Sequence, residues 1–352
     1  MKILILALSG IGDALMFTPA LELMRKELPD ARIDALVMYR AAKEMLGRNS
    51  DLNNVYYFDF LKEGVLRSLK YILSLRHKYD VSLNVYPSNR REYNIINFLV
   101  GAQKRVAVKY LRKDKQNFGA LNNIRVPEND FIHNVQTNIK LVEKLLDKKF
   151  EEEPPLKFPL TPGDEDFAQK FLSDNRLKTT DMLVGFHPGS ATLKNQIKRR
   201  WEPEKFAGLG KRLINDRNAK ILIFGGPDES GLKRKIKELI NSENAIVVDS
   251  PGFTENAAVI GKCKVFVSND SGLMHIASAL KANLVAILGP TNPHYIHPWK
   301  TEHIVVRLDL DCSPCFIYSQ RPLICFRQDI LFKCIKELTV DMVYDAVLKL
   351  QS

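Results

Sequence analysis

The most concentrated set of chemically useful residues lies at positions 268–275, which read Ser-Asn-Asp-Ser-Gly-Leu-Met-His. An apolar run precedes this segment, and residues 273–280 continue with helical spacing. A strand that ends in Asp, a hydroxyl and Gly at a helix start offers N–H groups to a diphosphate and a carboxylate to sugar hydroxyls. Asp270 alone is more simply explained as a helix cap, but a cap does not require the whole run.

A second candidate is Ser9-Gly10-Ile11-Gly12-Asp13, which follows the apolar run KILILAL. Small residues at a strand-to-helix turn let backbone N–H groups approach a ligand. Asp13 either caps the helix or accepts a proton from a hydroxyl nucleophile. Two glycines do not make the three-glycine dinucleotide fingerprint, so support for NAD binding is weak.

Two further turns follow apolar runs in the second half of the chain. His187-Pro188-Gly189-Ser190 leads to a basic segment at 198–203, whose cations before a helix start suit a phosphate; His187 alone could be a buried, hydrogen-bonded histidine. The second turn, at 225–229, is Gly-Gly-Pro-Asp-Glu. Asp228 or Glu229 could bind a ribose there, although a simple tight turn fits equally well.

Four of the five cysteines are Cys312, Cys315, Cys325 and Cys334, spaced C-x2-C-x9-C-x8-C. Four thiolates with a leading CxxC could hold a structural zinc ion, whereas the later spacing departs from common zinc ribbons and favours reduced structural thiols. Cys263 is expected to be a small buried residue. Five cysteines in 352 residues exclude a disulfide scaffold.

The elements that must position these residues follow an α/β pattern. Apolar runs rich in β-branched residues alternate with helical patterns in both halves, which predicts parallel sheets covered by helices. The acidic, proline-rich segment 151–164 is the best domain boundary. We expect domains at 1–155 and 156–335, followed by a final helix at 336–352. The expected strands lie at 2–8, 33–38, 55–58, 81–85, 105–108, 183–186, 220–224, 245–248, 265–267 and 284–288.

The positive charge is concentrated in the first half. Residues 1–150 hold 25 Lys and Arg against 16 Asp and Glu, whereas residues 151–352 hold 27 against 25. Such an excess favours an anionic partner such as nucleic acid, anionic lipid or a phosphorylated saccharide, or is an ordinary solvated surface. The sequence contains no apolar run of about 20 residues and no signal cleavage site, so we expect a cytoplasmic protein.

Taken together, the motifs resemble glycosyltransferase family 9, whose best-known members are ADP-heptose:lipopolysaccharide heptosyltransferases. The resemblance runs from residue 1 to about 340. It rests on the order and spacing of the motifs Ser-x-Ile-Gly-Asp at 9–13, His-Pro-Gly at 187–189, Arg-Arg-Trp-Glu-Pro at 199–203, Gly-Gly-Pro-Asp-Glu at 225–229, Asp-Ser-Gly-Leu-Met-His at 270–275, Gly-Pro-Thr-Asn-Pro at 289–293 and Cys-Ser-Pro-Cys at 312–315.

The resemblance implies a GT-B fold: two facing Rossmann-like domains with parallel sheets and an interdomain cleft. It also implies that the final helix, at 336–352, packs back on the first domain. It implies metal-independent, inverting transfer of a heptose, from ADP-L-glycero-D-manno-heptose, to the inner core of lipopolysaccharide. Asp13 would be the general base. Arg199, where many members have Lys, would neutralise the leaving diphosphate, although Arg has a different geometry.

The remaining roles are also implied by the resemblance. Asp270 would hold sugar hydroxyls, and Asp228 or Glu229 the ribose. The other donor-side residues are Ser9, Gly10, Gly12, His187, Ser271, Gly272, Leu273 and His275. Anionic core sugars at the cytoplasmic face of the inner membrane would be the partner of the basic first half, with peripheral membrane contact and no nucleic acid. The expected acceptor-binding residues are Arg90, Arg91, Lys104, Arg105, Lys113 and Lys115.

Three alternatives stay open. A family member could use another nucleotide sugar for a cell-surface glycan. A nicotinamide-dependent oxidoreductase fits the opening turn but not its missing third glycine. A nonenzymatic binder of anionic glycans fits the charge but leaves Asp13 and the 270–275 segment unexplained.

Overall fold

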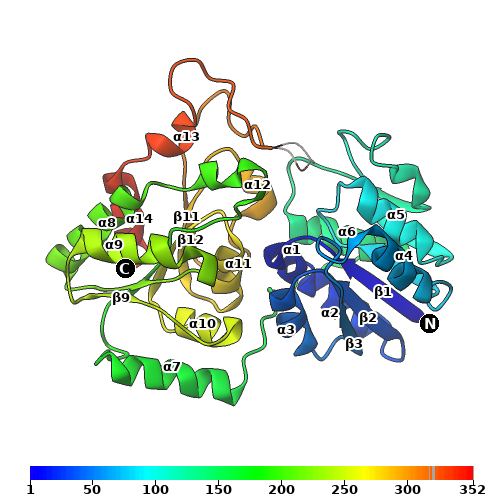
Figure 1. Ribbon diagram of the computed structural model, residues 1–352, viewed down its shortest axis with the longest axis horizontal. Coiled ribbons are helices and arrows are strands. Elements are labelled where there is room, and N and C mark those ends of the chain that lie inside the picture. The colour runs from blue at the N-terminus through cyan, green and yellow to red at the C-terminus, as the bar shows by residue number, and fades with distance from the viewer. Residues whose placement is uncertain (317, 319–321, 352) are drawn as a thin grey trace. The chain divides into compact units, whose positions relative to one another are not determined.

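The computed structural model describes residues 1–316, 318 and 322–351 (Figure 1). The chain forms two compact units. The first unit comprises Met1–Pro159 together with Tyr318, and the second comprises the other described residues from Leu160 onward. The chain passes from one to the other inside the proline-rich segment 151–164.

The first unit is built on a parallel sheet of six strands in the order β3-β2-β1-β4-β5-β6. Its central strands are continuous apolar runs: Ile3, Leu4 and Ile5 of β1 are at most 1% exposed. Strands of this kind are buried on both faces, as a parallel sheet between helices requires. The strands are β1 (Lys2–Ala7), β2 (Arg32–Val37), β3 (Asn54–Tyr57), β4 (Val81–Asn84), β5 (Lys104–Lys109) and β6 (Ile124–Pro127).

Helices cover both faces of this sheet. Right-handed crossovers place α4 and α5 on the face that carries Leu4, Leu6 and Leu36, and α1, α2 and α3 on the other, where α6 contacts α2. Residues 14–28 have the apolar spacing of one continuous helix, but the structure breaks it at Phe17, just before Pro19. The helices are α1 (Ile11–Met16), α2 (Thr18–Glu27), α3 (Arg40–Gly47), α4 (Gly64–Ser74), α5 (Arg91–Leu99) and α6 (Asn134–Leu146), with a short 3₁₀ helix η1 (Gly119–Leu121).

The second unit repeats this plan with a parallel sheet in the order β12-β11-β10-β7-β8-β9. Its strands are β7 (Leu183–His187), β8 (Lys220–Ile223), β9 (Ala245–Val247), β10 (Val265–Asn269), β11 (Asn283–Ile287) and β12 (His303–Val306). Its helices are α7 (Pro162–Asp174), α8 (Pro203–Arg217), α9 (Ser230–Ile240), α10 (Phe253–Ile260), α11 (Gly272–Ala279), α12 (Pro293–Ile296), α13 (Lys333–Lys336) and α14 (Val340–Lys349), with 3₁₀ helices η2 (Leu193–Arg199) and η3 (Pro227–Glu229).

Both sheets therefore have the Rossmann strand order, and each has one topological switch point. In the first unit it lies between β1 and β4, and in the second between β7 and β10. Ligands of open α/β sheets bind beyond the carboxyl ends of the strands at this point. The segments that follow these four strands are thus the places to look for a site.

The final helix corrects one expectation. We expected it to pack on the first unit, but α14 belongs to the second, where Val343 and Val347 are fully buried in the core beside Trp201. The indole N–H of Trp201 donates to the carbonyl oxygen of Leu338 at 2.9 Å, just before α14 begins. The apolar face of α14 thus completes the core between the sheet and α8.

Tyr318 is separated by more than 150 residues from the rest of the unit to which it belongs. Its carbonyl oxygen accepts a hydrogen bond from the amide of Asn89 at 3.1 Å, and its hydroxyl oxygen accepts one from the amide of Asn134 at 3.0 Å. Its ring packs edge-on against Tyr86. These contacts tie a late part of the sequence to the carboxyl edge of the first sheet. Within the residues described, no helix has the length and apolar character needed to cross a membrane.

Candidate functional site

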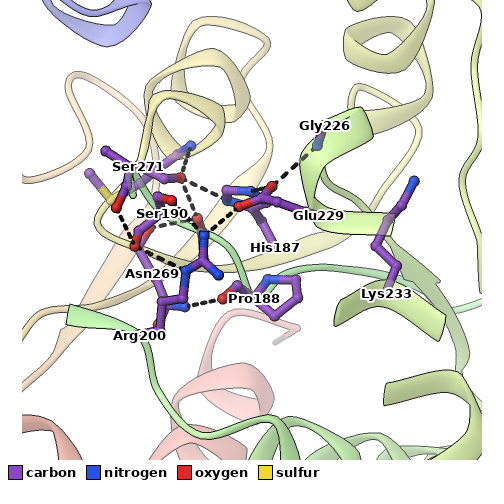
Figure 2. A network of polar contacts seen from close by, with 12 residues as sticks. His187, Pro188, Ser190, Arg200, Gly226, Glu229, Lys233, Asn269 and Ser271 are labelled. Carbon is purple, nitrogen blue, oxygen red and sulfur yellow. Dashed lines mark hydrogen bonds and ion pairs between the residues drawn. The ribbon is translucent and has the colours of Figure 1, made fainter. Parts of the chain in front are cut away.

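The switch point of the second unit carries a compact polar network (Figure 2). His187, the last residue of β7, is buried, and its Nδ1 lies 2.8 Å from the Ser271 hydroxyl. Its Nε2 lies 3.2 Å from a carboxylate oxygen of Glu229. One histidine therefore joins the turn after β10 to the turn after β8, which lie more than 40 residues apart in sequence. This is the satisfied buried histidine that the sequence allowed, placed inside the candidate site.

Glu229 is held as an anion by its neighbours. Burial raises the pKa of Glu229, but the hydrogen bond from His187 and the charge of Arg200 outweigh it, so the pKa lies below its ordinary value. The Arg200 guanidinium contacts this carboxylate at 3.0 Å and also donates to the Ser190 carbonyl oxygen at 2.7 Å. Of the two acidic candidates in this turn, Glu229 enters the network, and Asp228 is exposed.

Gly189 explains why a glycine follows His187 and Pro188. A Cβ atom at this position would lie 1.9 Å from Glu229 Oε1. Only a residue without a side chain lets the backbone of this loop pass so close to the carboxylate. The loop, the carboxylate and Arg200 are therefore fitted to one another.

A second cluster lies beside this network and contains Asp270. Its carboxylate is paired with the Arg199 guanidinium and accepts a hydrogen bond from the Thr291 hydroxyl at 2.6 Å. Arg199 also donates to Gln196 at 2.6 Å. Arg199 and Asp270 are each 7% exposed, and the buried Arg199 Nε has no hydrogen-bond partner among the described residues. A buried ion pair with an unpartnered N–H donor is suited to an anionic, hydroxyl-rich ligand.

The helix after β10 starts at Gly272, and its cap is Ser271, so the expectation that Asp270 caps it is wrong. Ser271 is the N-cap of α11, and its hydroxyl accepts the Met274 N–H at 3.4 Å, while Gly272 and Leu273 form the first turn. His275, one turn further, is buried, and burial lowers its pKa to about 4. It is therefore neutral at physiological pH. Its Nδ1 is buried without a hydrogen-bond partner in the part of the chain that the structure describes.

In the first unit, Asp13 lies at the switch point between β1 and β4. The Gly10 N–H donates to the Asp13 carboxylate at 3.0 Å, so Asp13 caps the first turn of α1. The Ser9 hydroxyl donates to the Pro87 carbonyl oxygen at 2.5 Å and joins the ends of the two strands. Gly12 is buried inside α1. Asp13 thus caps α1, and this hydrogen bond holds its half-buried carboxylate at the carboxyl edge of the first sheet, where ligands of such sheets bind.

Aromatic hydroxyls surround Asp13. Burial raises the pKa values of Tyr39, Tyr93 and Tyr110, and the negative charge of Asp13 raises all three further. Arg90 opposes this shift at Tyr39 and Tyr93, and its guanidinium lies 5.4 Å from the centre of the Tyr93 ring. Asp13 and Arg90 therefore both lie near tyrosines whose hydroxyls stay protonated.

The other predicted acceptor-binding residues separate into two groups. Lys113 and Lys115 lie in the loop that follows β5, at the same carboxyl edge as Asp13. Lys104 and Arg105 begin β5 and pair with the first residues of β4, so they lie at the opposite edge. The expectation that Lys104 and Arg105 lie with the other acceptor residues is therefore wrong, because the length of β5 separates them from Lys113 and Lys115.

Two arginines expected at the acceptor are engaged with their own neighbours. The Arg105 guanidinium donates to the carbonyl oxygens of Leu121 and Ala102 at 2.8 Å each. Exposed Arg91 forms an ion pair with Glu92 at 3.1 Å.

The zinc prediction concerns the four cysteines near the end of the chain. No group of three or more His, Cys, Asp and Glu residues within 1–316, 318 and 322–351 has the arrangement of a metal site. All five thiols are free. Cys334 is buried next to Gly289, and burial raises its pKa to about 11; Cys325 accepts the Phe332 N–H at 3.2 Å. Zinc or structural thiols at the four late cysteines stays a prediction, whereas Cys263 is a buried thiol as expected.

Several residues of the site were not singled out from the sequence. Arg200 was visible only as part of a basic segment, and Thr291 only as part of a proline-rich loop. Asn269 joins the two clusters: its amide donates to the Pro188 carbonyl oxygen at 2.8 Å, and its side-chain oxygen accepts the Trp201 N–H at 3.0 Å. No local signal distinguishes such residues, because their roles depend on partners far away in sequence.

Known proteins are similar to this chain in sequence and in fold. The model of glycosyltransferase family 9 (heptosyltransferase) matches residues 69–323. Lipooligosaccharide heptosyltransferase 2 of Haemophilus ducreyi is 29% identical over 88% of this chain and 89% of its own. Lipopolysaccharide heptosyltransferase 2 of Salmonella typhimurium is 28% identical over 88% of both chains. The structure of Escherichia coli ADP-heptose lps heptosyltransferase II has a TM-score of 0.75 and 22% identity over 99% of this chain and 98% of its own. These two Rossmann-like units therefore have the GT-B fold, and the chain is a glycosyltransferase that belongs to family 9.

Proposed function

We propose that this glycosyltransferase transfers a heptose from ADP-L-glycero-D-manno-heptose to the inner core of lipopolysaccharide. The names of the Haemophilus and Salmonella relatives support the acceptor class, and the name of the Escherichia coli enzyme with the matching structure supports the donor. The transfer inverts the anomeric carbon and uses no metal ion. The enzyme works in the cytoplasm, in peripheral contact with the inner membrane.

The observation that carries the proposal is the buried cluster of Arg199, Asp270 and Thr291 at the switch point of the second sheet. Asp270 receives hydroxyls of the donor sugar in place of its present donors. Arg199 then turns its guanidinium to the diphosphate, and the first N–H groups of α11, from Gly272 onward, support the same charge. Glu229 receives the ribose hydroxyls.

The chemical step needs one base and one stabilised leaving group. The acceptor hydroxyl oxygen attacks the anomeric carbon from the face opposite the diphosphate, and its proton passes to the Asp13 carboxylate. The bond between the anomeric carbon and the phosphate oxygen breaks, and ADP leaves with the bonding electron pair. Arg199 stabilises the charge that develops on this oxygen. Every proton and charge is accounted for by groups of the chain and the two substrates.

Acceptor binding falls to the carboxyl edge of the first sheet. Arg90, Lys113 and Lys115 supply cations for the phosphates and acidic sugars of the core. The half-buried Tyr39 hydroxyl near Asp13 is protonated at neutral pH and can donate to or accept from sugar hydroxyls, whereas the buried Tyr93 hydroxyl donates to the Leu8 carbonyl oxygen at 2.8 Å.

The test is turnover of the purified chain with ADP-heptose and a heptose-deficient lipopolysaccharide core, read by ADP release and by mass spectrometry of the product. Asp13→Asn is expected to reduce kcat by 10²- to 10⁴-fold, the usual contribution of a general base, while the Kd for ADP is unchanged. Asp30→Asn, an exposed carboxylate of the same unit, is the matched control and should keep full activity.

Other outcomes separate the parts of the proposal. Turnover with a UDP- or GDP-sugar and none with ADP-heptose would agree with membership of the family but would show that ADP-heptose is not the donor. Activity lost in EDTA and restored by a divalent cation would contradict the metal-independent step. An Asp13→Asn variant with normal kcat would remove Asp13 from the mechanism.

A further inference from the structure

The first unit carries an exposed apolar face that its core does not use. It lies on α4 and the residue group just before it, where Val65 and Leu66 are 83% and 82% exposed. Leu61, Leu69 and Leu73 are also exposed. Isolated exposed leucines are ordinary, but five within 13 residues form a continuous feature.

Helical geometry places the exposed residues of α4 on one side. At 100° per residue, Val65, Leu69, Leu73 and Leu66 fall within an arc of about 100°. Lys70 and Arg67 fall on the next arc, within about 100° of Leu66. The helix therefore presents an apolar strip with a cationic strip along one border.

The remaining side of α4 is occupied by the protein core. Ile72 is 5% exposed and packs in the cluster that contains Leu4 and Leu6. The Tyr71 ring stacks on Phe58 with centroids 4.3 Å apart. These contacts hold the helix in place, whereas Val65 and Leu66 are more than 80% exposed and Leu69 and Leu73 are 40% and 42% exposed.

The surroundings of the strip are positively charged. Lys62 and Arg67 have side chains 85% and 80% exposed, and Lys70 is exposed as well. The acidic groups here are Glu63, which pairs with Arg67 at 3.1 Å, and Asp59, which lies 3.9 Å from Lys62. Residues 61–78 contain five Lys and Arg and one Glu, so the cations prevail.

Neighbouring α5 extends this chemistry. It contacts α4 (Figure 1), and its Ile95 and Phe98 are 36% and 47% exposed. The Arg105 guanidinium lies 5.5 Å from the centre of the Phe98 ring, and exposed Lys104 precedes it. The two basic residues that lie away from the Asp13 edge thus accompany apolar side chains on this part of the unit.

We propose that the outer face of α4 docks the enzyme on an anionic lipid membrane, with the helix axis parallel to the surface. Apolar side chains beside Lys and Arg on one helix are the composition of interfacial helices: the leucines enter the acyl boundary and the cations meet anionic headgroups. A second copy of the chain is a poorer occupant, because a two-fold contact through this face would bring the same cations together.

Vesicle flotation of the full chain tests this proposal, without sugar donor or acceptor. The vesicles contain phosphatidylethanolamine and phosphatidylglycerol at 7:3, or phosphatidylcholine alone. Wild-type protein is expected to float with the anionic vesicles and to bind phosphatidylcholine at least tenfold more weakly. The double variant Val65→Ser, Leu66→Gln is expected to lose about 10- to 100-fold in partitioning, since two buried aliphatic side chains are removed.

The matched control removes exposed apolar side chains from the second unit. Phe326 and Leu331 are 86% and 54% exposed, and the variant Phe326→Gln, Leu331→Gln should float as wild type. Lys62→Gln with Lys70→Gln should weaken anionic binding severalfold and reduce its salt dependence.

Two results would overturn the assignment. One is equal partitioning of wild type and Val65→Ser, Leu66→Gln. The other is a wild-type dimer by light scattering that this double variant converts to a monomer, because the face would then bind a second copy. Flotation requires no catalysis, so a failure of the proposed heptosyl transfer leaves the outcome readable.

Discussion

The buried imidazole of His275 makes the stability of the second unit depend on pH. Burial lowers its pKa to about 4, whereas an unfolded histidine titrates near 6.5. Between about pH 4 and pH 6.5, His275 therefore binds a proton in the unfolded state but stays neutral in the folded state. The stabilisation is complete above about pH 6.5, falls as the pH decreases, and levels off below about pH 4.

The size of this effect follows from the two pKa values. At pH 5 the unfolded histidine is almost fully protonated, while about one tenth of His275 is protonated in the folded protein. Linkage then lowers the free energy of unfolding by about 2 kcal/mol between pH 8 and pH 5. Replacing His275 with Gln, which does not titrate, should remove this part of the loss.

Urea unfolding at pH 5 and pH 8 measures the difference. Trp201 and Trp299, the two tryptophans of the chain, are both buried in the second unit, so their fluorescence reports the unit that contains His275. The loss between pH 8 and pH 5 should be about 2 kcal/mol smaller in His275→Gln than in wild type. His77→Gln, which removes an exposed histidine of the first unit, should retain the wild-type loss. Equal losses in wild type and His275→Gln would refute the reasoning.

Three further predictions concern the same unit. Asp270→Ala leaves the Arg199 charge buried without its partner and should cost about 3–5 kcal/mol in urea unfolding, whereas Arg199→Met with Asp270→Leu should recover most of it; no recovery would mean that burial of the charge is not the cause. Gly189→Ala must displace the Glu229 carboxylate, so the Kd for ADP, measured by calorimetry, should rise about tenfold. An unchanged Kd would mean that Glu229 does not bind the donor. Trp201→Phe removes the indole donor and leaves a buried carbonyl unsatisfied; urea unfolding should show a loss of about 1–3 kcal/mol, and no loss would mean that water satisfies the carbonyl.

The central strands could be predicted from sequence because each is an unbroken apolar run with turn residues at its end. The edge strands β6 and β12 were not predicted, because neither is an unbroken apolar run: β6 contains Arg125 and ends at Pro127, and β12 begins at His303. Such strands are defined by the neighbour with which they pair. The helical pattern at 14–28 hides the break at Phe17 because apolar residues continue across it.

The site shows the same division. The turns that carry Asp13, His187 and Asp270 were predictable, since each follows a strand and contains small and polar residues. The pairing of Arg199 with Asp270 was not, because it depends on the register of β7 against β10. Charge density in sequence misplaced Arg105, because a strand carries neighbours in sequence to opposite edges of a sheet.

The membership of Tyr318 in the first unit has a consequence for how the chain is made. Residues 1–159 emerge from the ribosome long before Tyr318 is added. While the second sheet is synthesised, the Asn134 amide therefore lacks its Tyr318 partner, and the Asn89 amide can donate to the Arg112 carbonyl oxygen but not to that of Tyr318. The first unit can collapse early, but its carboxyl edge becomes complete only after all six strands of the second sheet have been synthesised. A fragment ending at Pro159 should therefore fold with a less well-ordered carboxyl edge of the first sheet, near Asp13. Adding back the second sheet without Tyr318 would not restore the order of this edge.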